Sequence, residues 1–318
     1  LQRSHQLEQA EQELLIAKEL VTVLAEQNPS NQEFRASMAG TCGDLASVLI
    51  DRRKHDQAEQ ELTHALTLYQ TLITENPTSD EYFSRKSKIL IDFSRLYRQL
   101  GRFSDAELHV QEVIDDFDRL SKDSPEVRGH RVTLGHALWE LAEICQRTRR
   151  EDLAKQTYRR SLEVFDAAAQ DFPEWQYARL EFGHAHWLLG NLFFHAARID
   201  EAQDSFLESL QINNQLSTDF PDNLDYALRV VHRYRDLIRC TLKQDQIEQA
   251  IEFGEKAVEF CRQAHVTIRP ALIKELPSLQ MLIARAGLVA KPHASSWQQK
   301  LSQLIGEFRK LETENAQP

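Results

Sequence analysis

Apolar residues recur three and four positions apart along most of the chain, which is the spacing of one face of an α-helix. Residues 62–72 show the pattern, with Leu62, Ala65, Leu66, Tyr69 and Leu72 on a single helical face. Polar turns such as DRRKHDQ at 51–57 separate successive stretches. The pattern therefore predicts pairs of amphipathic helices, the first pair spanning roughly residues 31–52 and 55–75.

The helix pair repeats with a period of 48 residues. Two series of residues keep this step: the prolines Pro29, Pro77, Pro125, Pro173 and Pro221, and the alanines Ala10, Ala58, Ala106, Ala154, Ala202 and Ala250. The residue before a proline disfavours helical dihedrals, so each proline is expected to separate one helix from the next. A single hairpin cannot bury its own apolar face, and the units must therefore stack into an array.

The unit resembles the tetratricopeptide repeat, in which Leu-small, an aromatic or large residue, Ala, a large residue, Ala and Pro recur in order. The fourth complete copy carries this pattern as Leu189, Gly190, Phe193, Ala202, Phe206 and Ser209, and the second as Phe93, Ser94, Tyr97, Ala106, Val110 and Val113. The resemblance covers roughly residues 1–265, and the units are longer than the family's ~34 residues, which implies helices about two turns longer. It implies an all-α fold, a right-handed alpha-alpha superhelix whose first helices line a concave binding groove.

Two proline junctions carry a narrower resemblance. FPEWQYAR at 172–179 and FPDNLDYALR at 220–229 resemble junctions in tetratricopeptide arrays attached to bacterial serine/threonine protein kinases. The resemblance implies the docking or regulatory region of a larger bacterial signalling protein. The chain itself has no glycine-rich phosphate loop and no HRD or DFG motif, so we expect any kinase domain upstream of Leu1.

Both ends of the array depart from the repeat. Residues 1–27 supply only a second helix, whose first-helix partner is expected before Leu1. We divide the chain into a repeat array at 1–268 and a degenerate final hairpin with a loose tail at 269–318. In that hairpin, residues of one apolar face are expected to cover the last repeat: Trp297, Leu301, Leu304, Ile305 and Phe308.

Composition narrows the classes of function. The net charge of −11, from 38 basic and 49 acidic residues, disfavours nonspecific nucleic-acid binding by the whole surface. No apolar run approaches the roughly 18–20 residues of a membrane span. The four cysteines have no CxxC spacing, so neither a zinc site nor a disulfide framework is indicated, and a reducing cytoplasm fits best.

The first helices share a polar face that we expect to line the groove. At 100° per residue, His184, Trp187, Asn191, Phe194 and His195 fall on one side, opposite Leu189, Gly190 and Phe193. The same positions in four units are Lys88, Ile91, Arg95, Arg98 and Gln99; His136, Trp139, Glu143, Gln146 and Arg147; His184, Trp187, Asn191, Phe194 and His195; and His232, Arg235, Arg239, Leu242 and Lys243.

Seven of these twenty residues are lysine or arginine and only one is acidic, which is unexpected for a merely solvated face of an acidic chain. With Trp139 and Trp187 as aromatic anchors, the face is expected to bind a protein or peptide that is acidic or contains aromatic residues. The alternative is that both tryptophans pack against neighbouring helices. The sequence leaves open whether the partner is another protein or a kinase domain of the same chain.

Two other functions compete with a non-catalytic interaction scaffold. A hydrolase or metal enzyme would use His136, His184, Glu143 and His195, but His184 and His195 lie about 16 Å apart along the helix axis, and no HExxH or nucleophile motif occurs. We therefore expect no catalytic residue, metal or cofactor. Single-stranded nucleic acid could also bind aromatic and arginine side chains, although the acidic total charge disfavours it. His186, which replaces Leu138, is expected to be a buried, hydrogen-bonded core histidine.

Overall fold

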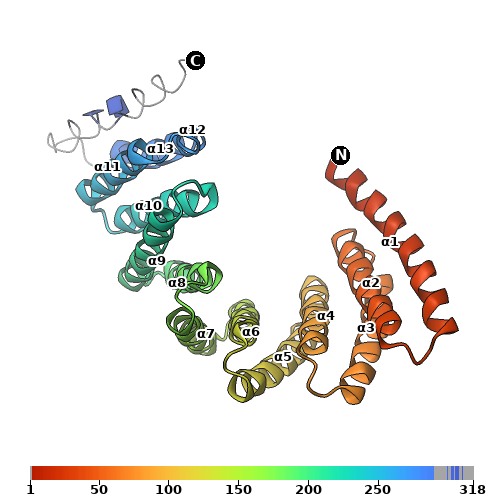
Figure 1. Ribbon diagram of the computed structural model, residues 1–318. Coiled ribbons are helices and arrows are strands. Elements are labelled where there is room, and N and C mark those ends of the chain that lie inside the picture. The colour runs from red at the N-terminus through yellow and green to blue at the C-terminus, as the bar shows by residue number, and fades with distance from the viewer. Residues whose placement is uncertain (1, 290–298, 300–301, 304, 308–309, 311–318) are drawn as a thin grey trace. The chain divides into compact units, whose positions relative to one another are not determined.

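The computed structural model describes residues 2–289, together with 299, 302, 303, 305–307 and 310, and these residues contain helices but no strand (Figure 1). The helices are α1 (Gln2–Gln27), α2 (Gln32–Asp51), α3 (His55–Glu75), α4 (Asp80–Gln99), α5 (Phe103–Asp123), α6 (Arg128–Arg147), α7 (Glu151–Asp171), α8 (Gln176–His195), α9 (Ile199–Asp219), α10 (Leu224–Lys243), α11 (Ile247–Gln263), α12 (Arg269–Ile273) and α13 (Leu276–Val289). The predicted all-α fold is confirmed. Of the residues expected to cap the array, Trp297, Leu301, Leu304 and Phe308 lie outside the described residues.

The chain forms two compact units, and the boundary between them falls within α7: unit 1 ends at Ser161 and unit 2 begins at Leu162. In unit 1 each helix from α1 to α5 packs against the next one in the sequence. In unit 2, α8 packs on α9, α9 on α10 and α10 on α11, while α12 and α13 contact α10 and α11. Consecutive helices therefore pack pairwise, as stacked tetratricopeptide-like hairpins require.

Each first helix starts three residues after a proline of the repeat, with the N-cap residue directly before it. The Asn31 side chain accepts hydrogen bonds from two backbone amides of α2, and Asn223 does the same for α10, while Ser79 accepts from one amide of α4. Val127 and Trp175 stand at the equivalent N-cap positions of α6 and α8 without a side-chain cap. Proline thus sets the start of the helix even where capping chemistry is missing.

The turn inside each hairpin uses one residue in the left-handed region, at positions that are again 48 apart. The residues are Arg53 (φ 58°), Gly101 (φ 73°), Arg149 (φ 59°), Ala197 (φ 57°) and Asp245 (φ 58°). The following amide closes the turn on the first helix, as when Lys54 N donates to Leu49 O at 2.9 Å. This is a Schellman C-cap, in which glycine is the favoured residue, and only one of the five turns has a glycine there.

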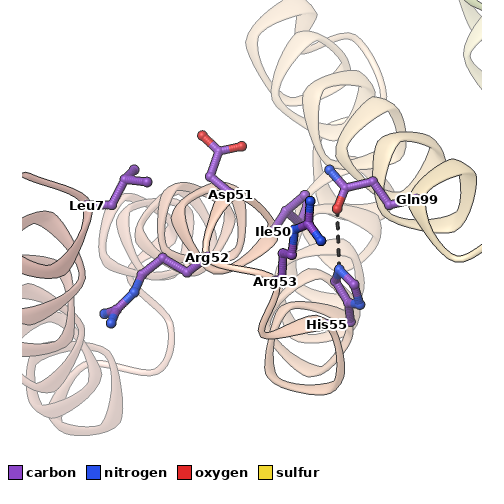
Figure 2. A pocket seen from close by; sticks show the side chains of 7 residues that line it. All are labelled: Leu7, Ile50, Asp51, Arg52, Arg53, His55 and Gln99. Atoms are coloured by element: carbon purple, nitrogen blue, oxygen red, sulfur yellow. Dashed lines mark hydrogen bonds between the residues drawn. The ribbon is translucent and has the colours of Figure 1, made fainter. Parts of the chain in front are cut away.

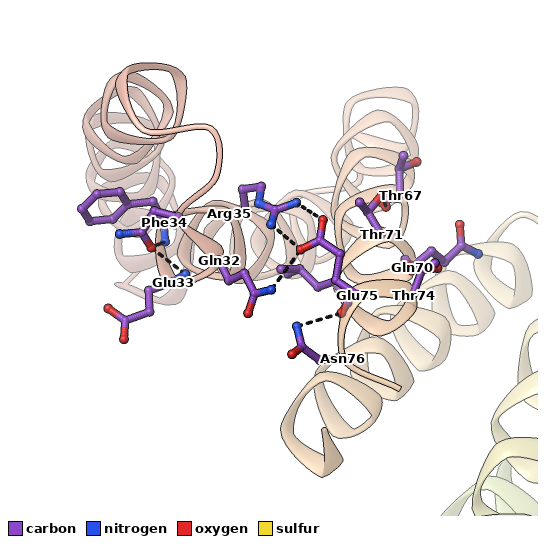
Figure 3. A network of polar contacts seen from close by, with 12 residues as sticks. Gln32, Glu33, Phe34, Arg35, Thr67, Gln70, Thr71, Thr74, Glu75 and Asn76 are labelled. Atoms are coloured by element: carbon purple, nitrogen blue, oxygen red, sulfur yellow. Dashed lines mark hydrogen bonds and ion pairs between the residues drawn. The ribbon is translucent and has the colours of Figure 1, made fainter. Parts of the chain in front are cut away.

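In two of the hairpins, an ion pair joins the two helices at the end opposite the turn. Arg35 of α2 donates from Nη1 to Glu75 Oε1 of α3 at 2.7 Å, and Gln32 donates to the same carboxylate (Figure 3). The hydrogen bond from Arg35 holds the pKa of Glu75 below its usual value. Arg179 and Asp219 form the equivalent pair in unit 2, at 2.7 Å between Nη1 and Oδ2. The hairpin register is therefore fixed by charge at one end and by backbone geometry at the other.

The core lies where small residues let helices approach. The alanines of the repeat from Ala58 to Ala250 are fully buried. At Gly190 a Cβ atom would lie 2.6 Å from the Phe206 ring, so α8 and α9 pack too closely there for any side chain. Helix α1 instead exposes a stripe of large apolar residues: Leu15, Ile16, Leu20, Val23 and Leu24.

Candidate functional site

The exposure of the predicted groove residues follows the predicted division of the helix faces. Every one of these residues is at least partly exposed. In unit 1 they are Lys88, Arg95 and Arg98 on α4 and His136, Trp139 and Glu143 on α6. In unit 2 they are His184, Trp187, Asn191, Phe194 and His195 on α8 and His232, Arg235 and Arg239 on α10. Leu189, Gly190 and Phe193 on the opposite face of α8 are buried. On α8, the side that the repeat pattern assigned to the core is therefore the buried side.

The predicted groove cations Lys88, Arg95 and Arg98 of unit 1 are paired with acids of their own or of neighbouring first helices. Lys88 Nζ lies 2.7 Å from Asp44 Oδ1, with both side chains about half exposed. Arg95 contacts Asp92 at 3.1 Å and donates to Ser47 Oγ at 2.7 Å. Arg98 forms ion pairs with Glu143 and, at 3.2 Å, with Glu140. The stripe of cations on α4 is therefore largely neutralised within the protein.

The sequence analysis did not identify Asp44, Asp92 and Glu140, the acids that form ion pairs with these cations. Asp44, Asp92, Glu140 and Asp236 occupy one position of the repeat, with Leu188 completing the series. Burial raises the pKa of Asp92 and Glu140, even though Arg95 and Arg98 act in the opposite direction. The 48-residue step that identified the cations would also have identified these acids. The predicted face includes other positions of the same helices and excludes this one.

Trp139 of unit 1 is partly buried on α6. Its ring lies edge-on to His136 of the preceding turn, with centroids 5.6 Å apart and an interplanar angle of 68°. The neighbouring Glu143 is engaged by Arg98. This part of the predicted face is therefore a polar surface organised around the α4–α6 ion pairs, with one aromatic ring at its edge.

Trp187 of unit 2 is held in a network that joins α8 to α10. Its indole Nε1 donates to Asp236 Oδ2 at 3.1 Å. The His184 ring stacks on it at 5.1 Å with an interplanar angle of 17°, and the Arg233 guanidinium carbon lies 4.8 Å from its ring centroid. The indole is thus fixed in position while part of its surface stays accessible.

The centre of this network is a buried ion pair. Asp236 has 3% of its side chain exposed and Arg233 has 9%, and Arg233 Nη2 lies 3.2 Å from Asp236 Oδ2. Burial outweighs the attraction of Asp236 and lowers the pKa of Arg233 to about 10. Arg233 takes the repeat position held by Ile89, Ala137 and Ala185. A charge at a repeat position that is uncharged in the other units, including Thr41 of α2, is the signal that would have identified it from the sequence.

The remaining unit 2 residues surround Trp187. Asn191 donates to the Trp187 carbonyl oxygen at 2.9 Å, and Arg239 lies over the Phe194 ring at 4.5 Å. Arg235, at the repeat position of Trp139 and Trp187, is partly exposed and forms no ion pair or hydrogen bond within the described part of the chain.

The histidines of the face have separate environments. His232 lies 3.7 Å from Glu275, and burial lowers the pKa of its imidazole. His195 is exposed at the end of α8. Among residues 2–289 and the other described positions, no group of three histidine, cysteine, aspartate or glutamate side chains could hold a metal ion.

His186 and the cysteines lie outside this face. His186 is partly exposed rather than buried and packs edge-on to Phe182 at 4.8 Å, and no hydrogen bond of its ring occurs among the described residues, so the expected core role is corrected. Its position near the edge of the buried α8 face lets an aromatic contact replace the hydrogen bond. The cysteines are buried, and burial raises the pKa of Cys42 and Cys261 to about 12, which leaves their thiols unreactive at neutral pH.

A cavity of about 820 Å³ lies in unit 1 beside the turn between α2 and α3 (Figure 2). Its lining residues come from α1, the end of α2, the turn, the start of α3 and the end of α4: Leu7, Ile50, Asp51, Arg52, Arg53, His55 and Gln99. His55 and Gln99 meet across one side at 3.3 Å. Arg52 is held by Glu8 and Glu11 of α1, so most of the charge in this cavity is already paired.

Three solved structures illustrate what this chain is similar to. The structure of BtubC (BKLC) from P. vanneervenii is similar at 17% sequence identity and a TM-score of 0.56, over 91% of this chain and 96% of that one. RapI in its apo form matches at 10% identity and a TM-score of 0.42, over 86% and 84% of the two chains. TTC0263, a thermophilic TPR protein from Thermus thermophilus, matches at 19% identity and a TM-score of 0.31, over 74% and 96%.

No protein-family model matches the sequence, and no curated protein is similar to it. The likeness to BtubC shows a shared fold over nearly the whole of both chains. Together with the 48-residue hairpins, it makes the chain a tetratricopeptide-like array of helical repeats. No helix among the described residues has the length and apolar character needed to cross a membrane.

Proposed function

We propose that the chain is a non-catalytic protein-interaction scaffold, and that the face of α8 and α10 around Trp187 is its main contact with a partner. Repeat arrays of this kind present extended surfaces to other proteins. The observation that carries the proposal is the fixed indole of Trp187, held by Asp236, His184 and Arg233 and still partly exposed. An ordered aromatic residue with arginines beside it is the usual composition of an interface hot spot.

The charges of this face favour an acidic partner segment. Arg235 forms no ion pair or hydrogen bond with another described residue. Lys243 is exposed at the end of the same helix and forms no ion pair with a described residue. A carboxylate of the partner could accept a hydrogen bond from Arg235 while an aromatic or aliphatic side chain covers Trp187. The paired cations of unit 1 have less to gain from the same ligand, because each would first have to leave an internal acid.

A peptide selection tests the proposal. Peptides from a random displayed library would be selected on the immobilised protein, and the affinity of the best binder would be measured by fluorescence anisotropy. Arg235→Ala is expected to weaken binding by about fivefold, since an ion pair at a partly exposed site contributes up to about 1 kcal/mol, which is about fivefold in affinity. Arg159→Ala, which removes an exposed cation on α7, is the control and should leave the affinity unchanged. Selected peptides that bind the Arg235→Ala variant as tightly as the wild type would refute the proposal.

We also propose that the array serves as the docking or regulatory region of a larger bacterial signalling protein in the cytoplasm. The support is the resemblance of FPEWQYAR and FPDNLDYALR to the junctions of kinase-linked arrays. The sequence of the complete gene tests it. An upstream kinase domain in the same reading frame is the expected result, and a complete gene without a signalling domain would contradict this role.

A further inference from the structure

A second cavity in unit 1 has a different chemistry from the face around Trp187. Its volume is about 550 Å³, and it lies between the first halves of α2 and α4, with α3 behind them. The residues that line it are Glu33, Ala36, Ser37, Gly40, Thr41, Asp44, Tyr69, Glu81, Tyr82 and Arg85. None of these is among the twenty predicted groove residues.

At one position of the cavity wall, α2 has a glycine where the other first helices have long or aromatic side chains. Gly40 occupies the position of Lys88, His136, His184 and His232. Ala36, Ser37 and Thr41 complete the small surface around it. A Cβ atom on Gly40 would lie 3.5 Å from the Tyr69 hydroxyl, an ordinary van der Waals contact, so Gly40 directly faces that hydroxyl.

Tyr69 supplies a hydroxyl group at the inner wall of this cavity, and the one hydrogen bond of that hydroxyl to a described residue is long. The residue is 2% exposed, and its hydroxyl donates only to the Ala36 carbonyl, at 3.4 Å. Ordinary O–H···O hydrogen bonds measure about 2.5–3.0 Å, so this one is weak. The phenol oxygen accepts no hydrogen bond from any described residue. A buried acceptor beside a cavity calls for a donor on whatever fills the cavity.

The charges around the cavity select a cation. Three carboxylates line it and a single arginine opposes them. Glu33 has no ion pair among the described residues, and its side chain points away from the Arg35–Glu75 pair (Figure 3). Glu81 and Arg85 are 3.8 Å apart and largely exposed, so their pairing is weak. Asp44 is already paired with Lys88 at 2.7 Å, so Glu33 and Glu81 are the carboxylates that offer most to a new cation.

We propose that this cavity receives one arginine side chain of a partner protein. The guanidinium group has five N–H donors in a planar arrangement, which suits carboxylates on different sides together with the Tyr69 hydroxyl oxygen. Its plane can also stack on the Tyr82 ring at the mouth of the cavity. A lysine ammonium group is compact and strongly hydrated, and it fits this spread of acceptors less well. The site takes a ligand of opposite charge to the one proposed for the Trp187 face and is independent of it.

The test uses the whole chain labelled with ¹⁵N-glycine, which gives few signals because the sequence has only 10 glycines. Nα-acetyl-L-arginine amide is the probe, and Nα-acetyl-L-citrulline amide, of nearly the same shape without the charge, is its matched control. We expect saturable shifts of the Gly40 and Gly43 amides with the arginine probe, binding at least about threefold weaker with citrulline, and no shift at Gly190 in unit 2.

Variants separate the cavity from general charge attraction. Glu33→Gln and Glu81→Gln are expected to weaken arginine binding by about threefold or more, whereas Glu19→Gln on the exposed surface of α1 should leave it unchanged. Gly40→His fills the cavity with the residue of the later units and should abolish the shift of Gly43. Equal affinity for arginine and citrulline, unchanged binding by Gly40→His, or no saturable shift of Gly40 would overturn the proposal.

Discussion

One acid and one arginine recur at equivalent positions in the two units, and their surroundings differ. Asp92 and Arg95 on α4 lie 3.1 Å apart, and Asp236 and Arg239 on α10 lie 3.4 Å apart. Oδ2 of Asp92 is buried without a hydrogen bond, whereas Oδ2 of Asp236 accepts from Trp187 and lies beside Arg233.

The cause is two residues of the repeat. Unit 1 has Gly43 where unit 2 has Trp187, and Ile89 where unit 2 has Arg233. A glycine has no side chain to donate, and Ile89 fills the space above it, since a Cβ on Gly43 would lie 2.4 Å from Ile89 Cδ1. Asp92 is therefore expected to destabilise unit 1, because one of its buried oxygens has no hydrogen bond. The equivalent Asp236 is at the centre of a hydrogen-bond and ion-pair network in unit 2.

The largest effect should come from neutralising the two aspartates. Asp236→Asn leaves Arg233 buried without a charged partner and is expected to lower the free energy of unfolding by about 3 kcal/mol. Asp92→Asn removes a carboxylate whose pKa burial has already raised, so a change within about 1 kcal/mol is expected. Urea unfolding followed by circular dichroism measures both. Equal losses would mean that the two networks do not differ in the way described.

Two glycines sharpen the contrast between a filled and an open site. Gly190→Ala in unit 2 would place a Cβ 2.6 Å from the Phe206 ring, and such overpacking is expected to cost about 1–3 kcal/mol. Gly40→Ala in unit 1 adds a methyl group in ordinary contact with the Tyr69 hydroxyl, and the higher helix propensity of alanine should stabilise the fold by about 0.5–1 kcal/mol. Thermal unfolding of the two variants is the measurement. A destabilising Gly40→Ala would show that no cavity exists there.

The hairpin turns of the two units differ by a smaller amount. Ala197→Gly in unit 2 relieves a left-handed alanine and is expected to stabilise by up to about 1 kcal/mol, while Gly101→Ala in unit 1 should destabilise by a similar amount. Melting temperatures that move in opposite directions support the turn geometry. Shifts in the same direction would argue against it.

The pH dependence of stability should be shared by both units. Burial lowers the pKa of His109 in unit 1 and of His232 in unit 2 below the ordinary value of 6.5. The unfolded chain therefore binds protons first as the pH falls through 6.5, and stability is lost in that window and below it. The thermal midpoint of unfolding should fall as the pH is lowered from about 7.5 to about 5.5. The fall should be less steep in a His109→Phe, His232→Gln double variant. An unchanged slope in that variant would contradict the assignment.

Much of the fold could be predicted from the sequence because the same prolines and buried alanines recur every 48 residues. Pro29 and its successors fixed where first helices start, and the predicted 31–52 and 55–75 became α2 and α3. The buried face of α8 was also predicted, since Leu189, Gly190 and Phe193 share one side of an ideal helix.

The site was harder to predict because its contacts join successive first helices. A tabulation of one helix face finds the cations Lys88, Arg95 and Arg98 but cannot show that Asp44 and Glu143 reach them. The cavity near Gly40 depends on a side chain that α2 lacks. Its signal in the sequence was a glycine at the repeat position where the other first helices have lysine or histidine.

The central claim is that the face around Trp187 anchors a partner while the paired cations of unit 1 do not. The most direct test compares Arg235→Ala with Arg98→Ala for one library-selected peptide, with affinities measured under identical low-salt conditions. The account predicts a loss of about fivefold for Arg235→Ala and less than about twofold for Arg98→Ala. A larger loss for Arg98→Ala than for Arg235→Ala would contradict it.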